Sequence, residues 1–230
     1  MNQMLKWAGH SNHHVRRLAS EGCRPSLPWA MALRDFKRDP SMILPILEQL
    51  KDDPSEYVRK SVANNLNDIS KDNPDLVLEI AKRWRGIGKD TDWIIKHACR
   101  TLLRKGSTKA LSHFNFFHPE SIIVKDLNCS SLTVPIEGAF QFSFKLESKE
   151  ENDVNLRIEY GLYFMKANGK QTRKVFKISE FNMKERKDIV ITKSHSFKTL
   201  TTRKHYPGNH NLTIIVNGVE MAEKAFLLTQ

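Results

Sequence analysis

The chain has 230 residues, enough for one large or two ordinary domains, and its formal net charge at pH 7 is +11. Hydrophobic residues make up 40% and charged residues 27%, a balance that argues against a disordered chain. Three Cys residues without paired spacing and nine scattered His residues argue against a disulfide framework and a zinc site, so we expect no metal and no cofactor.

The charge and the apolar pattern also restrict the partners of the chain. No stretch approaches the roughly 20 consecutive apolar residues that cross a bilayer, and residues 1–14 contain no apolar signal segment. We therefore expect a cytoplasmic monomer without a membrane partner. Lys and Arg exceed Asp and Glu in both halves, which favours nucleic acid as the partner ahead of an anionic membrane surface.

Residues 1–118 are predicted to form a stack of helix pairs. The segments "HVRRLASEG", "YVRKSVANNLND" and "IIKHACRTLLRKG" superpose, with Val15, Val58 and Ile95 as matching anchors. Their separations of about 40 residues are typical of HEAT and armadillo repeats. Each anchor begins the second helix of a pair. The first helices are predicted in "PWAMALRDF", "PSMILPILEQL" and "NPDLVLEIAKRW", where Pro suits a helix start.

The second helices carry the candidate site, because second helices line the concave face of a solenoid. The apolar stripe of Val58, Val62, Leu66 and Ile69 leaves Asn64, Asn67 and Asp68 on the opposite flank. The superposition places Glu21 on Asn64, so Glu21 and Asp68 are expected to face one groove. The basic residues expected to make this groove positive are Arg16, Arg17, Arg59, Lys60, Lys96, Arg100 and Arg104.

Carboxylates in a basic groove point to chemistry on a cationic centre. They repel DNA, so a groove that only binds phosphates would omit them. Hydrolysis of an N-glycosidic bond passes through an oxocarbenium-like sugar that a carboxylate stabilises. In such a site Trp29 would stack on a base or sugar, and Arg17 and Arg24 would hold phosphates.

Structural roles for the same residues remain open at this point. Glu21 and Arg17 form an ordinary i,i+4 helix pair, and Asp68 on a polar flank can simply be solvated. Trp29 at a predicted helix start can pack, and Trp84 and Trp93 are expected to pack within or between repeats. Cys23 lies near arginines that can lower its pKa, but it has no His and acid partner set for a nucleophile.

Residues 119–230 show a different pattern, of short runs in which apolar and polar residues alternate. These runs extend from "SIIVKDL" through "GAFQFSFKLES", "VNLRIEYGLYFM", "RKVFKISEF" and "KDIVITKSHSF" to "HNLTIIVNGV". They predict an antiparallel sandwich or barrel of about seven strands. The glycine turns in "KANGK" and "NGVE" are typical of hairpins and not of phosphate loops.

The motifs "VRRLASEGCRPSLPW" and "WIIKHACRTLLRKG", with the sequence between them, closely resemble AlkC-type DNA alkylation-repair glycosylases, relatives of AlkD. The resemblance implies a HEAT-like α-helical solenoid followed by an Ig-like antiparallel β-sandwich. It also implies a base-excision-repair enzyme that acts on double-stranded DNA. The substrates implied are the cationic bases 3-methylcytosine and 3-methyladenine, released without flipping the base into a deep pocket. Such a glycosylase is monofunctional and associates with the bacterial nucleoid through DNA.

Carried over onto this sequence, the resemblance makes Glu21 and Asp68 the catalytic carboxylates. Trp29 and Arg17 become neighbours that contact the lesion nucleotide and its backbone, and Asn64 supports the carboxylates. Members of this family usually have further N-terminal repeats that supply another acidic residue. This chain starts just before the "HHVRRLA" helix.

Two other classes of function are compatible with the sequence. One is a DNA-binding solenoid without chemistry, and the other is a scaffold that binds proteins. The basic loops "KANGKQTRKVFK" and "TTRKHYPGNH" of the sandwich are expected to approach DNA, and the alternative is a sandwich that only stabilises the chain.

Overall fold

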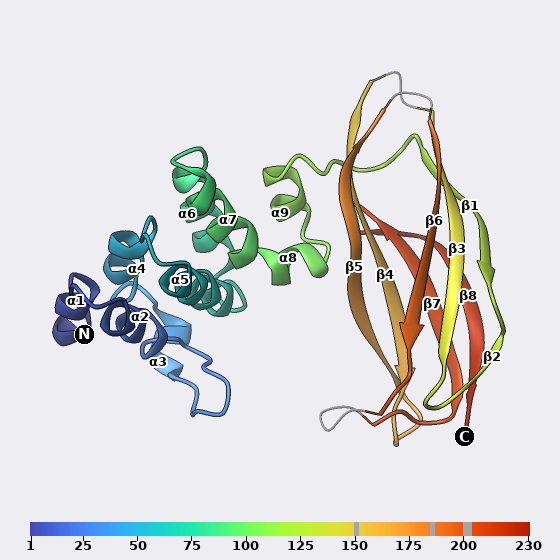
Figure 1. The fold of residues 1–230 in the computed structure, drawn as a ribbon, viewed down its shortest axis with the longest axis horizontal. Coiled ribbons are helices and arrows are strands. Elements are labelled where there is room, and N and C mark those ends of the chain that lie inside the picture. Colours follow the sequence, from blue (N-terminus) through green and yellow to red (C-terminus); the bar gives the residue numbers. More distant parts are fainter. Residues whose placement is uncertain (150–151, 185–186, 200–203) are drawn as a thin grey trace. The chain divides into compact units, whose positions relative to one another are not determined.

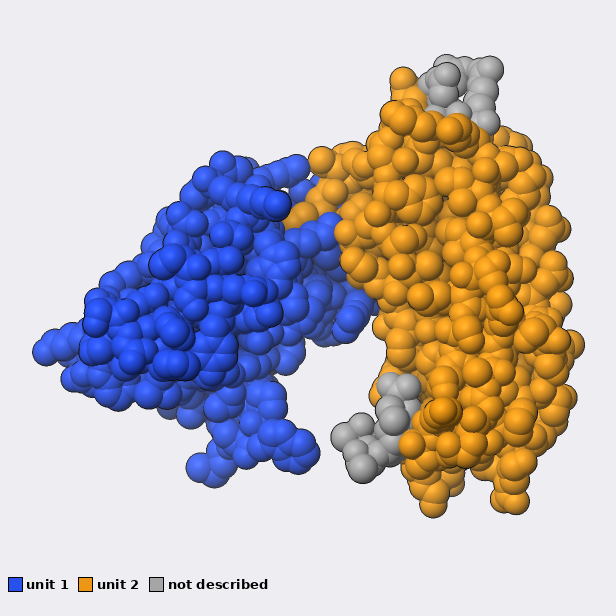
Figure 2. Space-filling model, viewed as in Figure 1, with its two compact units in different colours: residues 1–113 blue, residues 114–230 orange. Residues whose placement is uncertain are grey.

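The computed structural model describes residues 1–149, 152–184, 187–199 and 204–230. The chain divides into two compact units, the helical unit of residues 1–113 and the sandwich unit of residues 114–230 (Figure 2). The division predicted from the sequence falls a few residues later, between 118 and 119. Within the described residues no helix is long and apolar enough to cross a membrane.

The helical unit is built from short helices that pack on their neighbours along the chain (Figure 1). Helix α5 packs on both α2 and α7. Val15 and Val58 lie in the first turns of α2 and α5 as predicted, whereas Ile95 lies in the last turn of α7, so the prediction that Ile95 begins a helix is wrong. The described helices are α1 (Asn2–Ala8), α2 (His13–Glu21), α3 (Arg34–Arg38), α4 (Leu44–Leu50), α5 (Glu56–Ile69), α6 (Pro74–Trp84), α7 (Lys89–Ala98), α8 (Arg100–Arg104) and α9 (Thr108–His113).

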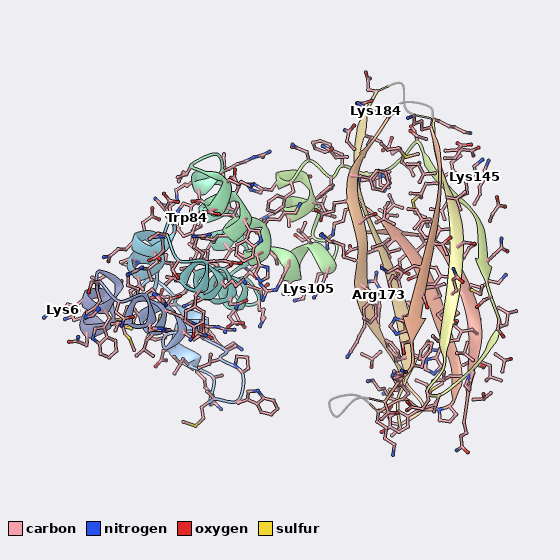
Figure 3. All side chains as sticks on the ribbon, viewed as in Figure 1. Lys6, Trp84, Lys105, Lys145, Arg173 and Lys184 are labelled. Atoms are coloured by element: carbon pink, nitrogen blue, oxygen red, sulfur yellow. The ribbon has the colours of Figure 1, made fainter. Side chains whose placement is uncertain are left out.

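The apolar stripe of α5 forms the centre of the helical core. Its members recur every three or four residues, so they share one face, and each is fully buried: Val58, Val62, Leu66 and Ile69. Trp84 on α6 is buried as well, and its Nε1 donates a hydrogen bond to Glu48 Oε2 at 2.9 Å (Figure 3). The prediction that Trp84 is a packing residue is confirmed.

Helix α2 has a capped first turn and buries small side chains near its end. Asn12 caps its first turn by accepting a hydrogen bond from the backbone N–H of His14 at 2.8 Å. Leu18 is 48% exposed, whereas Ala19 and Ser20 are fully buried. The reason is that α2 turns its two smallest side chains towards α5, where Asn65 donates to the Ser20 carbonyl.

The helix predicted in "PWAMALRDF" is wrong over its first half. The chain after α2 is not helical up to Leu33, and α3 comprises only Arg34–Arg38. Trp29 adopts a left-handed backbone conformation with φ of +65°, which a helix does not allow. The N–H of Leu33 donates to the carbonyl of Pro25 at 3.0 Å and closes the segment into a loop that projects beyond α2 and α3 (Figure 1).

The sandwich unit consists of two sheets, as Figure 1 shows. One has the strand order β1-β3-β6 and the other β2-β8-β7-β4-β5. All pairings are antiparallel except that of β2 with β8, which is parallel. The described strands are β1 (Ile122–Cys129), β2 (Thr133–Pro135), β3 (Ala139–Ser148), β4 (Val154–Met165), β5 (Gln171–Met183), β6 (Asp188–Ser196), β7 (Gly208–Val216) and β8 (Val219–Thr229).

Period-two burial builds the core between the sheets. On β3, Phe140, Phe142, Phe144 and Leu146 point inward, and none of them is more than 1% exposed. The helical region followed by a β-sandwich confirms the predicted fold class. The runs predicted from the sequence leave out two strands: β2, whose three residues are too few to show alternation, and β8, which begins where the last run ends.

The two predicted glycine turns are hairpins. "KANGK" joins β4 to β5 through Gly169, and Asn217 and Gly218 join β7 to β8 with φ values of +45° and +83°. Of the basic loops expected to approach DNA, "KANGKQTRKVFK" forms this first turn and the start of β5. Residues 201–203 of "TTRKHYPGNH" lie outside the described residues.

Candidate active site

The two candidate carboxylates come together where the end of α2 meets α5. Glu21 is the last residue of α2, and Asp68 lies in the last turn of α5. The Glu21 side chain is 15% exposed and that of Asp68 is 2% exposed. The prediction of a shared site therefore agrees with the geometry, but Asp68 is buried and not on a solvated flank. Asn67, placed on the same flank, is also buried.

Arg24, in the turn after α2, joins the two carboxylates. Its Nη1 donates to Glu21 Oε1 at 2.7 Å, and its Nε donates to Asp68 Oδ2 at 2.8 Å. Burial alone would lower the pKa of Arg24, but hydrogen bonds to Asp68 and Glu21 outweigh burial and raise it above its ordinary value. The sequence predicts that Arg24 binds a phosphate. In the structure its guanidinium binds carboxylates of the same chain.

Serine hydroxyls fix the second oxygen of Glu21. Ser61 Oγ lies 2.7 Å from Glu21 Oε2 and 3.1 Å from Ser20 Oγ. Ser61 can thus donate to the carboxylate while it accepts from Ser20. The resemblance implies that Asn64 supports the carboxylates, whereas the residue of α5 that contacts Glu21 is Ser61, about one turn earlier. Side chains on a helix tilt towards its N-terminus, and Glu21 reaches back in this direction.

Sequence reasoning missed Ser61, although a signal was present. Ser61 and Asp68 are seven residues apart on α5 and so share a face, which indicates that both can serve one site. Asp68 Oδ1 also accepts a hydrogen bond from Lys71 at 2.7 Å, and the Lys71 side chain is 41% exposed. One oxygen of Asp68 is therefore held by a side chain at the surface.

Arg17 lies beside Glu21, which is the more exposed of the two carboxylates. Its Nη2 is 3.6 Å from Glu21 Oε2, and its guanidinium stacks over the ring of Tyr57 at 4.4 Å from the centroid. His13 and His14 also contact the Tyr57 ring, with centroid distances of 6.3 and 5.7 Å. Tyr57 is 45% exposed, so this group forms an aromatic and basic surface next to Glu21.

Trp29 is fully exposed in the loop between α2 and α3. The prediction that it packs at a helix start is wrong, because the loop holds it away from the helices. Met31 in the same loop is 90% exposed. A large indole without packing partners on a loop that follows Arg24 is available for a ligand.

The other expected phosphate ligands fall into two groups. Arg16 makes a bidentate ion pair with Asp53, and Arg59 donates to the carbonyls of Asp53 and Pro54 and pairs with Asp90. These two arginines tie α2, α5 and α7 together. The residues that lie at or near the surface are Lys60, Asn64, Lys96, Arg100 and Arg104.

Lys60 pairs with Glu56 at 2.8 Å on the exposed face of α5. Asn64 accepts a hydrogen bond from Arg100 Nη2 at 3.0 Å and does not contact either carboxylate directly. Cys23 is buried, and burial raises the pKa of its thiol to about 11. A thiol with this pKa is protonated at neutral pH and is not a nucleophile.

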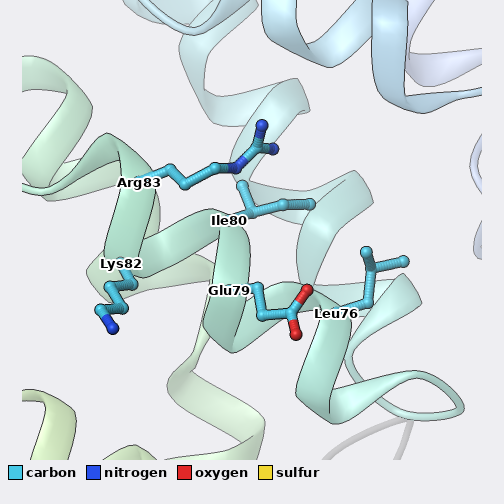
Figure 4. A pocket seen from close by; sticks show the side chains of 5 residues that line it. All are labelled: Leu76, Glu79, Ile80, Lys82 and Arg83. Carbon is cyan, nitrogen blue, oxygen red and sulfur yellow. The ribbon is translucent and has the colours of Figure 1, made fainter.

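Two hollows on the surface of the helical unit lie apart from the carboxylates. One lies on α6 and is lined by Leu76, Glu79, Ile80, Lys82 and Arg83 (Figure 4). The other lies between α3 and the start of α6, and its lining residues are Arg34, Lys37, Arg38, Asp72 and Asn73. Neither hollow includes Glu21 or Asp68.

The fold and the site define a helical-repeat protein that holds two carboxylates around one arginine and carries a C-terminal β-sandwich. Residues 1–102 match the model of the family described as "DNA alkylation repair enzyme". Residues 123–230 match the model described as "Uncharacterised protein YhaZ, C-terminal Ig-like domain". The helical unit thus matches the DNA alkylation repair enzyme model and the sandwich matches the YhaZ C-terminal Ig-like model, in agreement with the resemblance drawn from the sequence.

Two relatives extend over both units. The "Uncharacterized protein YhaZ" of Bacillus subtilis (strain 168) is 51% identical over 216 residues, which are 94% of this chain and 60% of that protein. The solved structure of the Pseudomonas fluorescens alkylpurine DNA glycosylase AlkC, bound to DNA containing an abasic site analog, is 37% identical with a TM-score of 0.95. The match covers 99% of this chain and 63% of AlkC. The chain thus spans about three fifths of the length of both relatives.

Proposed function

We propose that this chain is a DNA glycosylase that hydrolyses the N-glycosidic bond of cationic N-methylated bases in double-stranded DNA. The substrates we propose are 3-methyladenine and 3-methylcytosine. The observation that carries the proposal is the pair of carboxylates, Glu21 and Asp68, held by Arg24 in a basic helical unit. The similarity to an alkylpurine DNA glycosylase over 99% of this chain supports it.

The charge state of the site suits a substrate that is already cationic. A methylated base with a positive charge leaves as a neutral base, so the enzyme need not protonate it. The electrons of the glycosidic bond pass to the base, and the sugar takes on oxocarbenium character that a carboxylate stabilises. Water then adds to the anomeric carbon, and its proton passes to a carboxylate or to solvent.

Glu21 and Asp68 take different positions in this mechanism. Glu21 is partly exposed, and Ser61 and Arg24 fix both of its oxygens, so it is oriented before the substrate arrives. Asp68 lies deeper. Its Oδ1 becomes accessible from the surface when the ion pair with Lys71 breaks. An ion pair with a side chain 41% exposed is weak enough to exchange. Both carboxylates therefore act on the sugar or on the water that attacks it.

The surface around the carboxylates supports DNA as the partner. Arg17 stands beside Glu21, Trp29 is exposed for stacking, and Lys60 and Arg100 lie along α5 and α8. Lys96 on α7 belongs to the same proposed set. Arg24 and Arg59 hold partners within the chain, so we assign them to positioning. Stacking and phosphate contacts together are typical of nucleic-acid surfaces.

Single-turnover release of methylated base from defined duplexes tests this function. We expect Glu21→Gln and Asp68→Asn each to lower the rate constant by a factor of about 100 or more, because each removes charge opposite the developing cation. DNA affinity should change little. Glu79→Gln on the exposed face of α6 is a matched control and should retain the wild-type rate. Wild-type rates in both site variants would refute the assignment.

A DNA-binding protein without chemistry is the second candidate, because Glu21 and Asp68 are both held by cations of the same chain. It predicts salt-sensitive DNA binding with no base released. Lys71, the lysine described at the site, is in an ion pair with Asp68, and an ammonium group is not a nucleophile, so we propose hydrolysis without strand cleavage. Trapping of a covalent DNA adduct by borohydride would contradict this.

A further inference from the structure

Arg100 differs from the other partly buried arginines of the helical unit in the kind of partner that it has. Its Nη1 donates to the His97 carbonyl at 2.8 Å and its Nη2 to Asn64 Oδ1 at 3.0 Å, and both acceptors are neutral. No carboxylate pairs with Arg100 in the described part of the chain. Three others each have one, namely Arg16 with Asp53, Arg24 with Asp68 and Arg59 with Asp90.

The charge of Arg100 is therefore poorly compensated. Burial, and then the nearby charge of Arg104, lower the pKa of Arg100, and Asp68 acts on it only at longer range. Arg104 is exposed, and within the described residues it has no ion pair. A partly buried cation with neutral partners beside a second cation favours binding of an anion.

His97 lies one helical turn before Arg100 and completes the cluster. Its ring stacks on Trp93, with centroids 4.9 Å apart and an angle of 16° between the planes. Trp93 packs on His97 but is 40% exposed, so the prediction that it packs holds only in part, and its indole forms one wall of this surface. Lys60 approaches from α5, where it pairs with Glu56.

We propose that His97, Arg100 and Arg104, with Trp93 behind the imidazole, bind one backbone phosphate of DNA. The proposal rests on the proposed function, because DNA is the source of the phosphate. A phosphate is an acceptor only, so it matches two guanidinium groups and the N–H of an imidazole, and its negative charge favours the protonated imidazole. Binding of DNA should therefore draw a proton onto His97.

The free protein is set for this proton uptake. Burial, followed by the charges of Arg100, Arg104 and Lys60, lowers the pKa of His97 to about 4, so the imidazole is neutral at pH 7. A phosphate next to it offsets these cations and raises the pKa. DNA affinity must then increase as the pH falls from the pKa of the bound state towards that of the free state.

Calorimetric titration of an undamaged duplex at pH 6.5, in two buffers of different ionisation enthalpy, measures the protons taken up. We expect wild-type protein to take up a fraction of one proton and His97→Gln to take up less. Between pH 7.5 and 5.5 wild-type affinity should rise roughly threefold to tenfold more than that of the variant. His113→Gln is the matched control, because burial also lowers the pKa of His113.

Arg104→Gln provides an independent test, since an exposed side chain can be replaced without unfolding the chain. Loss of one phosphate contact should make the slope of log K against log salt less negative by about one. Equal proton uptake by wild type and His97→Gln, or an unchanged slope in Arg104→Gln, overturns this inference and leaves the glycosylase proposal intact. Absence of DNA binding in every variant, wild type included, overturns both.

Discussion

At the scale of single residues, Arg24 explains how two carboxylates from different helices are held at one site. Its guanidinium contacts Glu21 and Asp68 together, and its side chain is only 9% exposed. A planar fork of donors suits two acceptors on different helices, which the ammonium group of Lys does not match. The same contact fixes the end of α2 to the last turn of α5.

Arg24→Ala should destabilise the protein strongly, because it leaves Asp68 buried with Lys71 as its remaining cationic partner. Loss of one member of a buried ion pair costs about 3–5 kcal/mol. Arg38→Ala removes an exposed pair with Asp35, whose side chains are 81% and 88% exposed, and should have almost no effect. Chemical denaturation of both variants makes the comparison. Equal, small losses would show that Arg24 is not a structural link.

At the scale of elements, the loop between α2 and α3 distinguishes this unit from a plain stack of helix pairs. Pro25 and Pro28 remove two backbone donors, and the left-handed Trp29 ends any helical run. The loop starts at Arg24, inside the carboxylate cluster, so its base is fixed and its tip is exposed. This places an exposed indole on a loop that begins at the candidate site.

Trp29→Ala should leave the stability of the protein unchanged within about 0.5 kcal/mol, because the side chain is fully exposed. Affinity for duplexes with a methylated or abasic nucleotide should fall, since stacking on an aromatic ring contributes roughly 1–3 kcal/mol per base. Met31→Ala, at a 90% exposed position in the same loop, is the control for a general effect of the loop. Equal affinity of Trp29→Ala and wild type for damaged DNA would refute the stacking role.

The elements also show what the sequence could predict. Helical periodicity identified the buried stripe of α5, and alternation identified the long strands, because each pattern covers many residues. The loop after α2 was misassigned because Pro at a helix start and Pro in a loop look the same in sequence. The partners of Glu21 needed the packing of α2 on α5. The resemblance implied Asn64 as the supporting residue, and the contact is made by Ser61, one turn earlier on the same helix.

At the scale of the whole molecule, the formal net charge of +11 is spread over both units. The arginines that bind internal carboxylates contribute little to a DNA surface, so net charge overstates the phosphate contacts. On the helical unit, the cations that remain at the surface near the candidate site include Arg17, Lys60, Arg100 and Arg104. We therefore expect the salt dependence of DNA binding to reflect these four cations, and so to be weaker than the net charge alone would suggest.

DNA affinity of the whole chain should fall with salt, with a slope of log K against log salt of roughly −3 to −4 or steeper for about four phosphate contacts. Fluorescence anisotropy over a salt series measures the slope. Lys6→Gln changes a basic residue on α1 that the site does not use (Figure 3), and it should retain the wild-type slope. A slope near zero would support the protein-scaffold alternative.

The parallel pairing of β2 with β8 governs when the sandwich can assemble during synthesis. Val134 and Thr229 are 95 residues apart in sequence, yet they meet in this pairing, and β8 lies between β2 and β7. The five-stranded sheet is therefore incomplete until residues 219–229 have been made. The helical unit closes through neighbouring helices and can fold while translation continues. The helices that hold the candidate site are thus complete in sequence before the last strand of the sandwich has been made.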